Sequence, residues 1–160
     1  MQLTEHFADT ELGVAGAPAQ AAANAKQLCT LLLEPIRAHF GGPVDLSCGL
    51  RQPADNAEVG GKLNSQHLYL GGNSAADIEQ LPVTLPEAFD WIRLESGLPF
   101  DQLILEYENS GDGCRPGCLH ISYNSELATQ RREALTGSTG NGLIYTQVAS
   151  WPGAARSMNG

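Results

Sequence analysis

The sequence predicts an α+β protein: a small single domain in which helices flank an antiparallel sheet. Its 160 residues are enough for one domain with a core and too few for two ordinary ones. Hydrophobic residues make up 42% of the chain, which indicates a globular rather than a disordered protein. Helical patterns alternate with strand-like segments, and the short turns between neighbouring strands favour antiparallel pairing.

The first expected element is a helix over residues 18–40, after an irregular lead-in over residues 1–17. Pro35 lies inside the helical pattern and implies a kink or a break. The glycines and proline at 41–43 end the helix. Apolar residues recur at steps of three and four, which lines one helix face: Ala25, Leu28, Cys29, Leu32, Ile36 and Phe40.

The middle of the chain contains three strand-like segments and a short helix. Residues 44–48 alternate between apolar and polar, as a strand with one buried face does. A short helix is expected over residues 53–59. Residues 65–70 and 75–79 are strand-like, and Gly71-Gly72-Asn73 forms the turn between them.

The next helix has a clear start. Thr84 is a suitable N-cap, Pro86 stands early in the helix, and Glu87 lies at the capping-box position three residues after the cap. Phe89 and Ile92 then share one face of the helix, and Gly97 provides a C-terminal stop.

The last part of the chain is expected to contain three more strands. Residues 102–107 and 118–123 form two of them, with residues 109–117 as a polar loop in between. Residues 143–148 form the third, in a tail rich in glycine and serine. No internal repeat and no second domain is apparent.

The charge of the chain excludes some partners. Nine Lys and Arg against eighteen Asp and Glu give a formal charge of −9. Nucleic acid is not expected as a partner, since phosphate contacts need clustered cations. Direct attraction to an anionic membrane or wall polymer is not expected either. No apolar run could span a bilayer, and the N-terminus lacks the features of a signal peptide, so we expect a protein made in the cytoplasm. We also expect a monomer.

Three residues next to strand-like segments carry the strongest chemical signal. They are His67, Asp77 and His120. Two imidazoles and a carboxylate, with a fourth position for water, are the ligands of a catalytic zinc site. Such a site produces a hydroxide-like nucleophile near neutral pH. If the three meet in space, the protein is a hydrolase. Taken alone, each histidine is more often an ordinary residue satisfied by a hydrogen bond.

The four cysteines lack the paired CxxC spacing of a structural zinc site. Cys29 and Cys48 stand in apolar contexts, which is typical of buried thiols. Cys114 and Cys118 bracket Arg-Pro-Gly. They could form a short-loop disulfide or remain free.

Several motifs occur in a recognisable order. They are Ser47-Cys-Gly-Leu-Arg51 with Asn56, Ser65-Gln-His67, Ala75-Ala-Asp77, Phe100-Asp-Gln-Leu-Ile104-x-Glu106 and Leu119-His120-Ile-Ser-Tyr123. This succession resembles the zinc D-alanyl-D-alanine carboxypeptidases and the related phage and bacterial cell-wall endopeptidases, which share a fold with the hedgehog signalling domain. The resemblance runs from about Leu3 to Leu135.

The resemblance implies roles for the residues of these motifs. His67, Asp77 and His120 would bind Zn²⁺. Arg51 would hold the substrate's carboxylate or peptide carbonyl, for which its planar fork is suited. Ser65 would orient substrate or a ligand. Asn56 would belong to the substrate site, where it would support the surrounding loop rather than contact the substrate itself.

A general base is also required, and Glu106 fits best. In the related enzymes a glutamate lies shortly before the last histidine. On a strand, Ile104, Glu106 and Glu108 share one face, which would place the acid beside the metal. The alternative is an exposed glutamate at a strand end, with Glu108 and Asp112 as substitutes.

The chain departs from the family pattern at two places. Family members usually have seven positions from the first histidine to the aspartate, whereas the step from His67 to Asp77 is ten. If the extra residues lengthen the turn, both ligands still face one metal; an odd shift in register would turn one away. Cys118 replaces an aromatic residue two places before His120. We do not expect it to be a ligand, because a fourth protein ligand would close the water position.

Together these observations predict a zinc peptidase that hydrolyses peptidoglycan stem peptides, as a D-Ala-D-Ala carboxypeptidase or an endolysin-type endopeptidase. Residues 1–137 would form the catalytic domain, and residues 138–160 a partly irregular C-terminal extension. The enzyme would act on the cell wall after release, or as part of a virion. The competing hypothesis is a non-catalytic, zinc-stabilised phage structural or binding module with the same fold.

Overall fold

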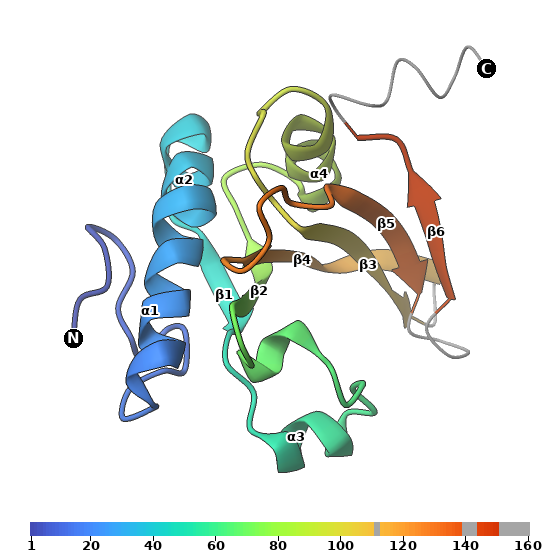
Figure 1. Cartoon of the computed structure of the whole chain (residues 1–160). Helices are drawn as coiled ribbons and strands as arrows, with labels where there is room; N and C mark the ends of the chain where they lie inside the picture. Colours follow the sequence, from blue (N-terminus) through green and yellow to red (C-terminus); the bar gives the residue numbers. More distant parts are fainter. Residues whose placement is uncertain (111–112, 139–143, 151–160) are drawn as a thin grey trace.

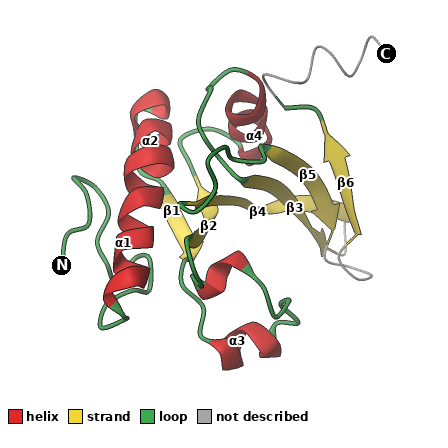
Figure 2. Ribbon diagram, viewed as in Figure 1, coloured by secondary structure: helices red, strands yellow, loops and turns green. Residues whose placement is uncertain are grey.

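A six-stranded sheet with helices around it forms the centre of the protein (Figures 1 and 2). The computed structural model describes residues 1–110, 113–138 and 144–150. The strands lie in the order β1-β2-β4-β3-β5-β6. All neighbours pair antiparallel except β3 and β5, which run parallel. The predicted α+β class is confirmed, with this one parallel pair as an exception to the expected antiparallel sheet.

The long N-terminal helix is present but interrupted. It consists of α1 (Ala19–Leu28), the π-helical segment η1 (Cys29–Leu33) and α2 (Glu34–Phe40). The predicted break coincides with Pro35, which lies in the first turn of α2 and lacks the N–H that an interior position would need. Gly41 ends the helix in the left-handed conformation with a φ of 70°.

The chain then forms β1 (Asp45–Cys48), α3 (Pro53–Glu58) and β2 (Asn73–Gln80), close to the expected positions. The predicted strand over residues 65–70 is wrong. This segment contains the 3₁₀ helix η2 (Gln66–Leu68), because the Ser65 hydroxyl accepts a hydrogen bond from the N–H of His67 and caps a helical turn.

Helix α4 (Leu85–Leu94) begins as predicted. The Thr84 hydroxyl accepts from the N–H of Glu87, and the Glu87 carboxylate accepts from the N–H of Thr84, which makes the capping box. Gly97, with a φ of 66°, turns the chain after the helix. Figure 1 shows α4 at the opposite end of the molecule from α3.

Strands β3 (Gln102–Ser110) and β4 (Gly113–Asn124) form a long hairpin. The predicted loop over residues 109–117 is therefore wrong for the described part of that segment. The turn residues suggest a loop, but backbone pairing across the hairpin continues past them. An irregularity follows Glu106, where Gly117 has no opposite residue and the register shifts.

The last strands are β5 (Glu133–Ser138) and β6 (Ile144–Val148). The predicted strand over 143–148 is confirmed for its described residues, whereas β5 was not predicted. Its apolar residues Ala134 and Leu135 are too few to produce a clear pattern. Parallel pairing with β3 places it in the sheet, and a short sequence window cannot reveal such a long-range contact.

The two faces of the sheet differ in chemistry. Helices α1 and α4 contact strands β2, β3 and β4 and share one apolar core with them. The other face carries polar side chains at its centre. Among the described residues, no helix is long and apolar enough to cross a membrane. Fully buried side chains that form the core include Leu28, Leu32, Ile78, Ile92, Leu103, Leu119 and Ile121.

Candidate metal centre and active site

The structure brings His67, Asp77 and His120 together on the polar face of the sheet. Asp77 in β2 lies directly opposite His120 in β4, so both side chains point to the same side. His67 reaches them from η2, which contacts β2. The three residues are 4%, 9% and 6% exposed.

The three side chains meet atom to atom. Nε2 of His67 lies 3.1 Å from Oδ1 of Asp77 and 3.1 Å from Nδ1 of His120. Nδ1 of His120 also lies 3.1 Å from Oδ1 of Asp77. Ligand atoms at 2.0–2.1 Å from a tetrahedral zinc ion would be separated by about 3.3 Å. The triangle is therefore close to the size that such an ion needs.

The ten-residue step from His67 to Asp77 is accommodated by a longer turn. Tyr69 and Gly71 both adopt positive φ, at 52° and 59°, and reverse the chain between η2 and β2. Tyr69 is buried and its hydroxyl donates to the carbonyl of Ala75, which holds the turn. The longer turn does not shift the pairing of β2 with β4, in which Asp77 stands opposite His120. The Asp77 carboxylate therefore points to the same side of the sheet as both imidazoles.

The sulfur of Cys48 lies near Nδ1 of His67, whereas Asp77 and His120 lie near Nε2 on the other side of the ring. It is close enough to His67 and Asp77 for the three to hold a metal ion. However, Nδ1 of His67 lies 2.8 Å from the Gly49 carbonyl and 3.7 Å from the Cys48 sulfur. Because the carbonyl accepts the Nδ1 hydrogen, Nε2 is the nitrogen that faces Asp77 and His120, and it carries the lone pair when the ring is neutral. This geometry favours the set with His120 over the set with Cys48.

The charges of the cluster depend on one another. Burial alone would raise the pKa of Asp77, but its hydrogen bonds and charge interactions with His120 and His67 lower it well below its usual range. Burial alone would lower the pKa of His67, but hydrogen bonds with Asp77 and Cys48 raise it to about 10. Without a metal, the site therefore holds an imidazolium next to a carboxylate.

Metal binding should release a proton from this site. Ligation needs a neutral imidazole, while His67 in the metal-free protein keeps its proton up to a pKa of about 10. The affinity for zinc is therefore expected to rise with pH through the neutral range and to level off above that pKa. Calorimetric titration in buffers of different ionisation enthalpy should detect about one proton released per ion near neutral pH. Binding without proton release would contradict the proton assigned to His67.

Arg51 lies at the edge of the cluster. Its backbone N–H donates to the carbonyl of His67 over 2.7 Å, and its guanidinium lies 3.7 Å from Oδ2 of Asp77. Asn56, predicted to brace the loop, accepts from this guanidinium at 3.4 Å and donates to the carbonyl of Lys62. Gly61 passes so close to the Asn56 amide that a Cβ would collide with it.

Glu106 lies on the same face of the sheet as His120. Ile104 is directly opposite His120, and Glu106, two residues further along β3, is opposite Cys118. The Cys118 thiol is free and donates to Glu106 over 3.5 Å. The side chain of Cys114 lies outside the described residues.

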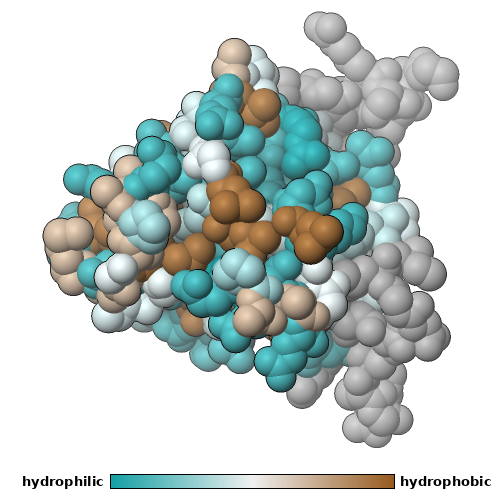
Figure 3. All heavy atoms as spheres, turned by 60° about the horizontal axis from the view of Figure 1, so that its bottom comes forward, coloured by the Kyte–Doolittle hydropathy of each residue, from teal (hydrophilic) through white to brown (hydrophobic). Residues whose placement is uncertain are grey.

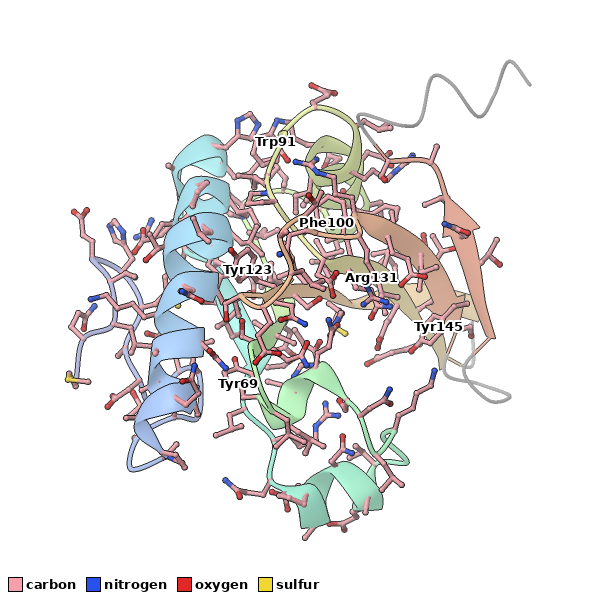
Figure 4. The ribbon with its side chains drawn as sticks, in the orientation of Figure 1. Tyr69, Trp91, Phe100, Tyr123, Arg131 and Tyr145 are labelled. Atoms are coloured by element: carbon pink, nitrogen blue, oxygen red, sulfur yellow. The ribbon has the colours of Figure 1, made fainter. Side chains whose placement is uncertain are left out.

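Tyr145 of β6 also lies beside Glu106. Burial raises the pKa of its hydroxyl to about 12, and the nearby charge of Glu106 and a hydrogen bond with it act in the same direction. Figure 4 shows Tyr145 at the far end of the sheet from α1. No sequence pattern marks this residue, since an isolated tyrosine in a tail gives no signal for a site.

A cleft of about 580 Å³ contains these groups. It lies between the polar face of the sheet and the segment from α3 to η2. Val59 borders it and is 65% exposed, and the nearby Leu63 is 95% exposed. Figure 3 shows the molecule from the α3 side, with a band of hydrophobic residues among hydrophilic ones. Predicted site residues that line the cleft are Arg51, Ser65, His67, Asp77, Glu106 and His120.

The substitutes for Glu106 are less well placed. Glu108 is exposed and is not among the described residues that line the cleft. Asp112 lies outside the described residues. The cleft also contains Gln66 and Arg131, to which the sequence assigned no role. Gln66 lies inside the Ser65-Gln-His67 motif, but only its side-chain contacts show a function, and no motif or periodicity marks Arg131.

An α+β fold with a buried cluster of two histidines and an aspartate that could hold a metal ion in a cleft is typical of metal-dependent hydrolases. Comparison with protein families gives the particular group: the peptidase M15 model matches residues 2–110, more than half of the chain. The protein belongs to the peptidase M15 family, which confirms the family resemblance and supports a peptidase. The match includes Arg51, His67, Asp77 and Glu106 and ends before His120. Comparison with curated proteins gives no significant match.

Proposed function

We propose that the protein is a zinc-dependent peptidase that hydrolyses peptidoglycan stem peptides, as a D-Ala-D-Ala carboxypeptidase or an endolysin-type endopeptidase. The observation that carries this proposal is the triangle of ligand atoms, 3.1 Å on each side, in the cleft of an M15 family member. His67, Asp77 and His120 would hold the zinc. When bound, zinc would lower the pKa of a water molecule and polarise the scissile carbonyl.

Glu106 is the proposed general base. It lies in the cleft on the same face of the sheet as His120. A carboxylate there would take a proton from the attacking water and deliver it to the leaving amine. The thiol of Cys118 and the hydroxyl of Tyr145 hydrogen-bond to Glu106 and would limit its side-chain rotamers.

Arg51 is proposed to hold the substrate and thereby to assist catalysis. Its guanidinium is half-buried beside Asp77 and is held by Asn56, so little side-chain freedom would be lost when it binds. A carboxylate or carbonyl of the peptide is the group it would bind. Ser65, which caps η2 next to His67, would orient the substrate or that ligand.

The proposed catalytic domain covers residues 1–137, with residues 138–160 as a C-terminal extension. Within that extension, β6 pairs with β5 and adds Tyr145 to the cleft. We propose that the protein works as a monomer on the cell wall, after release or as part of a virion.

Metal analysis combined with a cleavage assay tests the function. Protein purified without added metal should contain zinc, and should release peptide or D-alanine from purified peptidoglycan. Chelation should remove the activity, and stoichiometric zinc should restore it. Mass spectrometry of the products would identify the bond. Bound zinc without turnover would contradict the peptidase and favour the non-catalytic, zinc-stabilised module of a phage.

A further inference from the structure

We propose that Gln66, held by Asp101 and Arg131, is a positioning residue that fixes which nitrogen of His120 faces the metal. This inference rests on the proposed zinc site and deepens it. The three residues Gln66, Asp101 and Arg131 are called the Gln66 relay below. The relay reaches His120 on the side of the ring opposite the metal-binding cluster.

The relay begins at a buried carboxylate. Asp101 is 1% exposed and accepts three hydrogen bonds from Arg131: from its backbone N–H at 3.2 Å, from Nε at 2.9 Å and from Nη2 at 2.8 Å. Burial alone would raise the pKa of Asp101, but the bonds from Arg131 lower it below its usual value. Asp101 is thus ionised at neutral pH, and an ionised carboxylate can only accept hydrogen bonds.

The charge of Asp101 sets the orientation of the Gln66 amide. Nε2 of Gln66 donates to Oδ2 of Asp101 over 2.8 Å. The flipped amide would point its oxygen at the carboxylate, with two acceptors facing each other. The amide oxygen therefore faces His120, where it lies 3.3 Å from Nε2.

The amide oxygen in turn selects the tautomer of His120. Because the oxygen can only accept, Nε2 of His120 must carry a hydrogen. The lone pair of the neutral ring is then on Nδ1, which lies 3.1 Å from both His67 Nε2 and Asp77 Oδ1. The Gly49 carbonyl has the opposite effect on His67 and leaves Nε2 as its free nitrogen. The Gln66 amide thus leaves Nδ1 of His120 free, and the Gly49 carbonyl leaves Nε2 of His67 free. Both free nitrogens face the proposed metal position.

The relay joins parts of the fold that the metal ligands do not connect. Gln66 belongs to η2, next to His67, so one short helix positions both histidines. Asp101 precedes β3, and its backbone is anchored by hydrogen bonds with Ser122 in β4 and Glu133 in β5. Arg131 comes from the connection between β4 and β5 (Figure 4). Packing of these elements therefore sets the orientation of the His120 ring.

Zinc affinity tests the relay without reference to catalysis. Competition with a chromophoric chelator should show that Gln66→Ala and Asp101→Asn each weaken zinc binding about 10- to 100-fold, as for other partners of metal-bound histidines. Gln102→Ala is the matched control, because Gln102 lines the same cleft but donates to Glu133. It should bind zinc as the wild type does. Thermal unfolding of the metal-free proteins checks that each variant folds.

A double variant separates positioning from a general structural role. Gln66→Glu combined with Asp101→Asn exchanges the carboxylate and the amide, so an acceptor again faces Nε2 of His120. This variant should recover most of the lost zinc affinity, which a merely structural role does not predict. Unchanged affinity in Gln66→Ala, or loss without recovery in the double variant, would overturn the relay. If Asp101→Asn does not fold, the zinc affinity of Gln66→Ala alone tests the relay.

The relay and the proposed function can fail separately. Wild-type protein that binds zinc and cleaves no peptide would contradict the peptidase, while the affinity series would still support the relay. Equal zinc affinity in all variants would overturn the relay and leave the peptidase in place.

Discussion

Replacing His67 or His120 by alanine is expected to abolish zinc binding and peptide hydrolysis together. Each substitution removes one of the three proposed ligand atoms, which lie 3.1 Å apart, and leaves a buried carboxylate with one imidazole partner. The loss of affinity should exceed the roughly 10- to 100-fold effect of changing a residue behind a ligand. Metal content after dialysis and the rate of peptidoglycan cleavage measure the two effects.

His39→Ala is the control for this prediction. It also removes an imidazole, but one that stacks on Trp91 with ring centroids 3.7 Å apart, between α2 and α4. This variant should keep its zinc and its activity. Full zinc content in His120→Ala would show that another group takes the third position. Cys48 would then be the first candidate, since it already contacts His67.

Replacing Glu106 by glutamine should separate metal binding from catalysis. The amide has the shape of the carboxylate, can still accept from Tyr145 and does not touch the three ligand atoms. Zinc binding should therefore be unchanged. The amide cannot accept the proton of the attacking water, so kcat should fall by about 10²- to 10⁴-fold, the usual contribution of a general base. Steady-state kinetics on a stem-peptide substrate would measure this loss.

Glu133→Gln is a matched control for the Glu106 variant. Glu133 also lines the cleft, but its carboxylate accepts from Gln102 and lies 3.6 Å from Arg131. Its neutralisation should leave kcat close to that of the wild type. Full activity in Glu106→Gln would disprove the base assignment. Loss of activity in Glu133→Gln alone would transfer the role to that residue.

Local sequence patterns predicted most helices and strands correctly. The capping box at Thr84 and the break near Pro35 are examples in which the deciding interactions involve residues within four positions of each other. The strands β2 and β3 also follow from apolar residues next to turns. In such elements, local propensity and the final fold agree.

The errors occur where distant pairing decides the structure. Residues 109–117 contain turn residues, yet those described belong to a hairpin that the β3–β4 ladder extends. Strand β5 has little apolar character and exists through its parallel pairing with β3. Residues 65–70 are apolar enough for a strand, but the Ser65 cap and the hydrogen bond of Tyr69 favour a helical turn.

By itself, the sequence determined the α+β class and the family resemblance, and it singled out His67, Asp77 and His120 as candidate metal ligands, because these conclusions need only residue identity, local patterns and the order of motifs along the chain. Only the tertiary structure decided that the longer turn after His67 keeps Asp77 and both histidines at one point. It also added Tyr145 and the Gln66 relay. The physical reason is that these contacts join η2, the sheet and the chain beyond it, and no sequence spacing encodes the packing that brings them together.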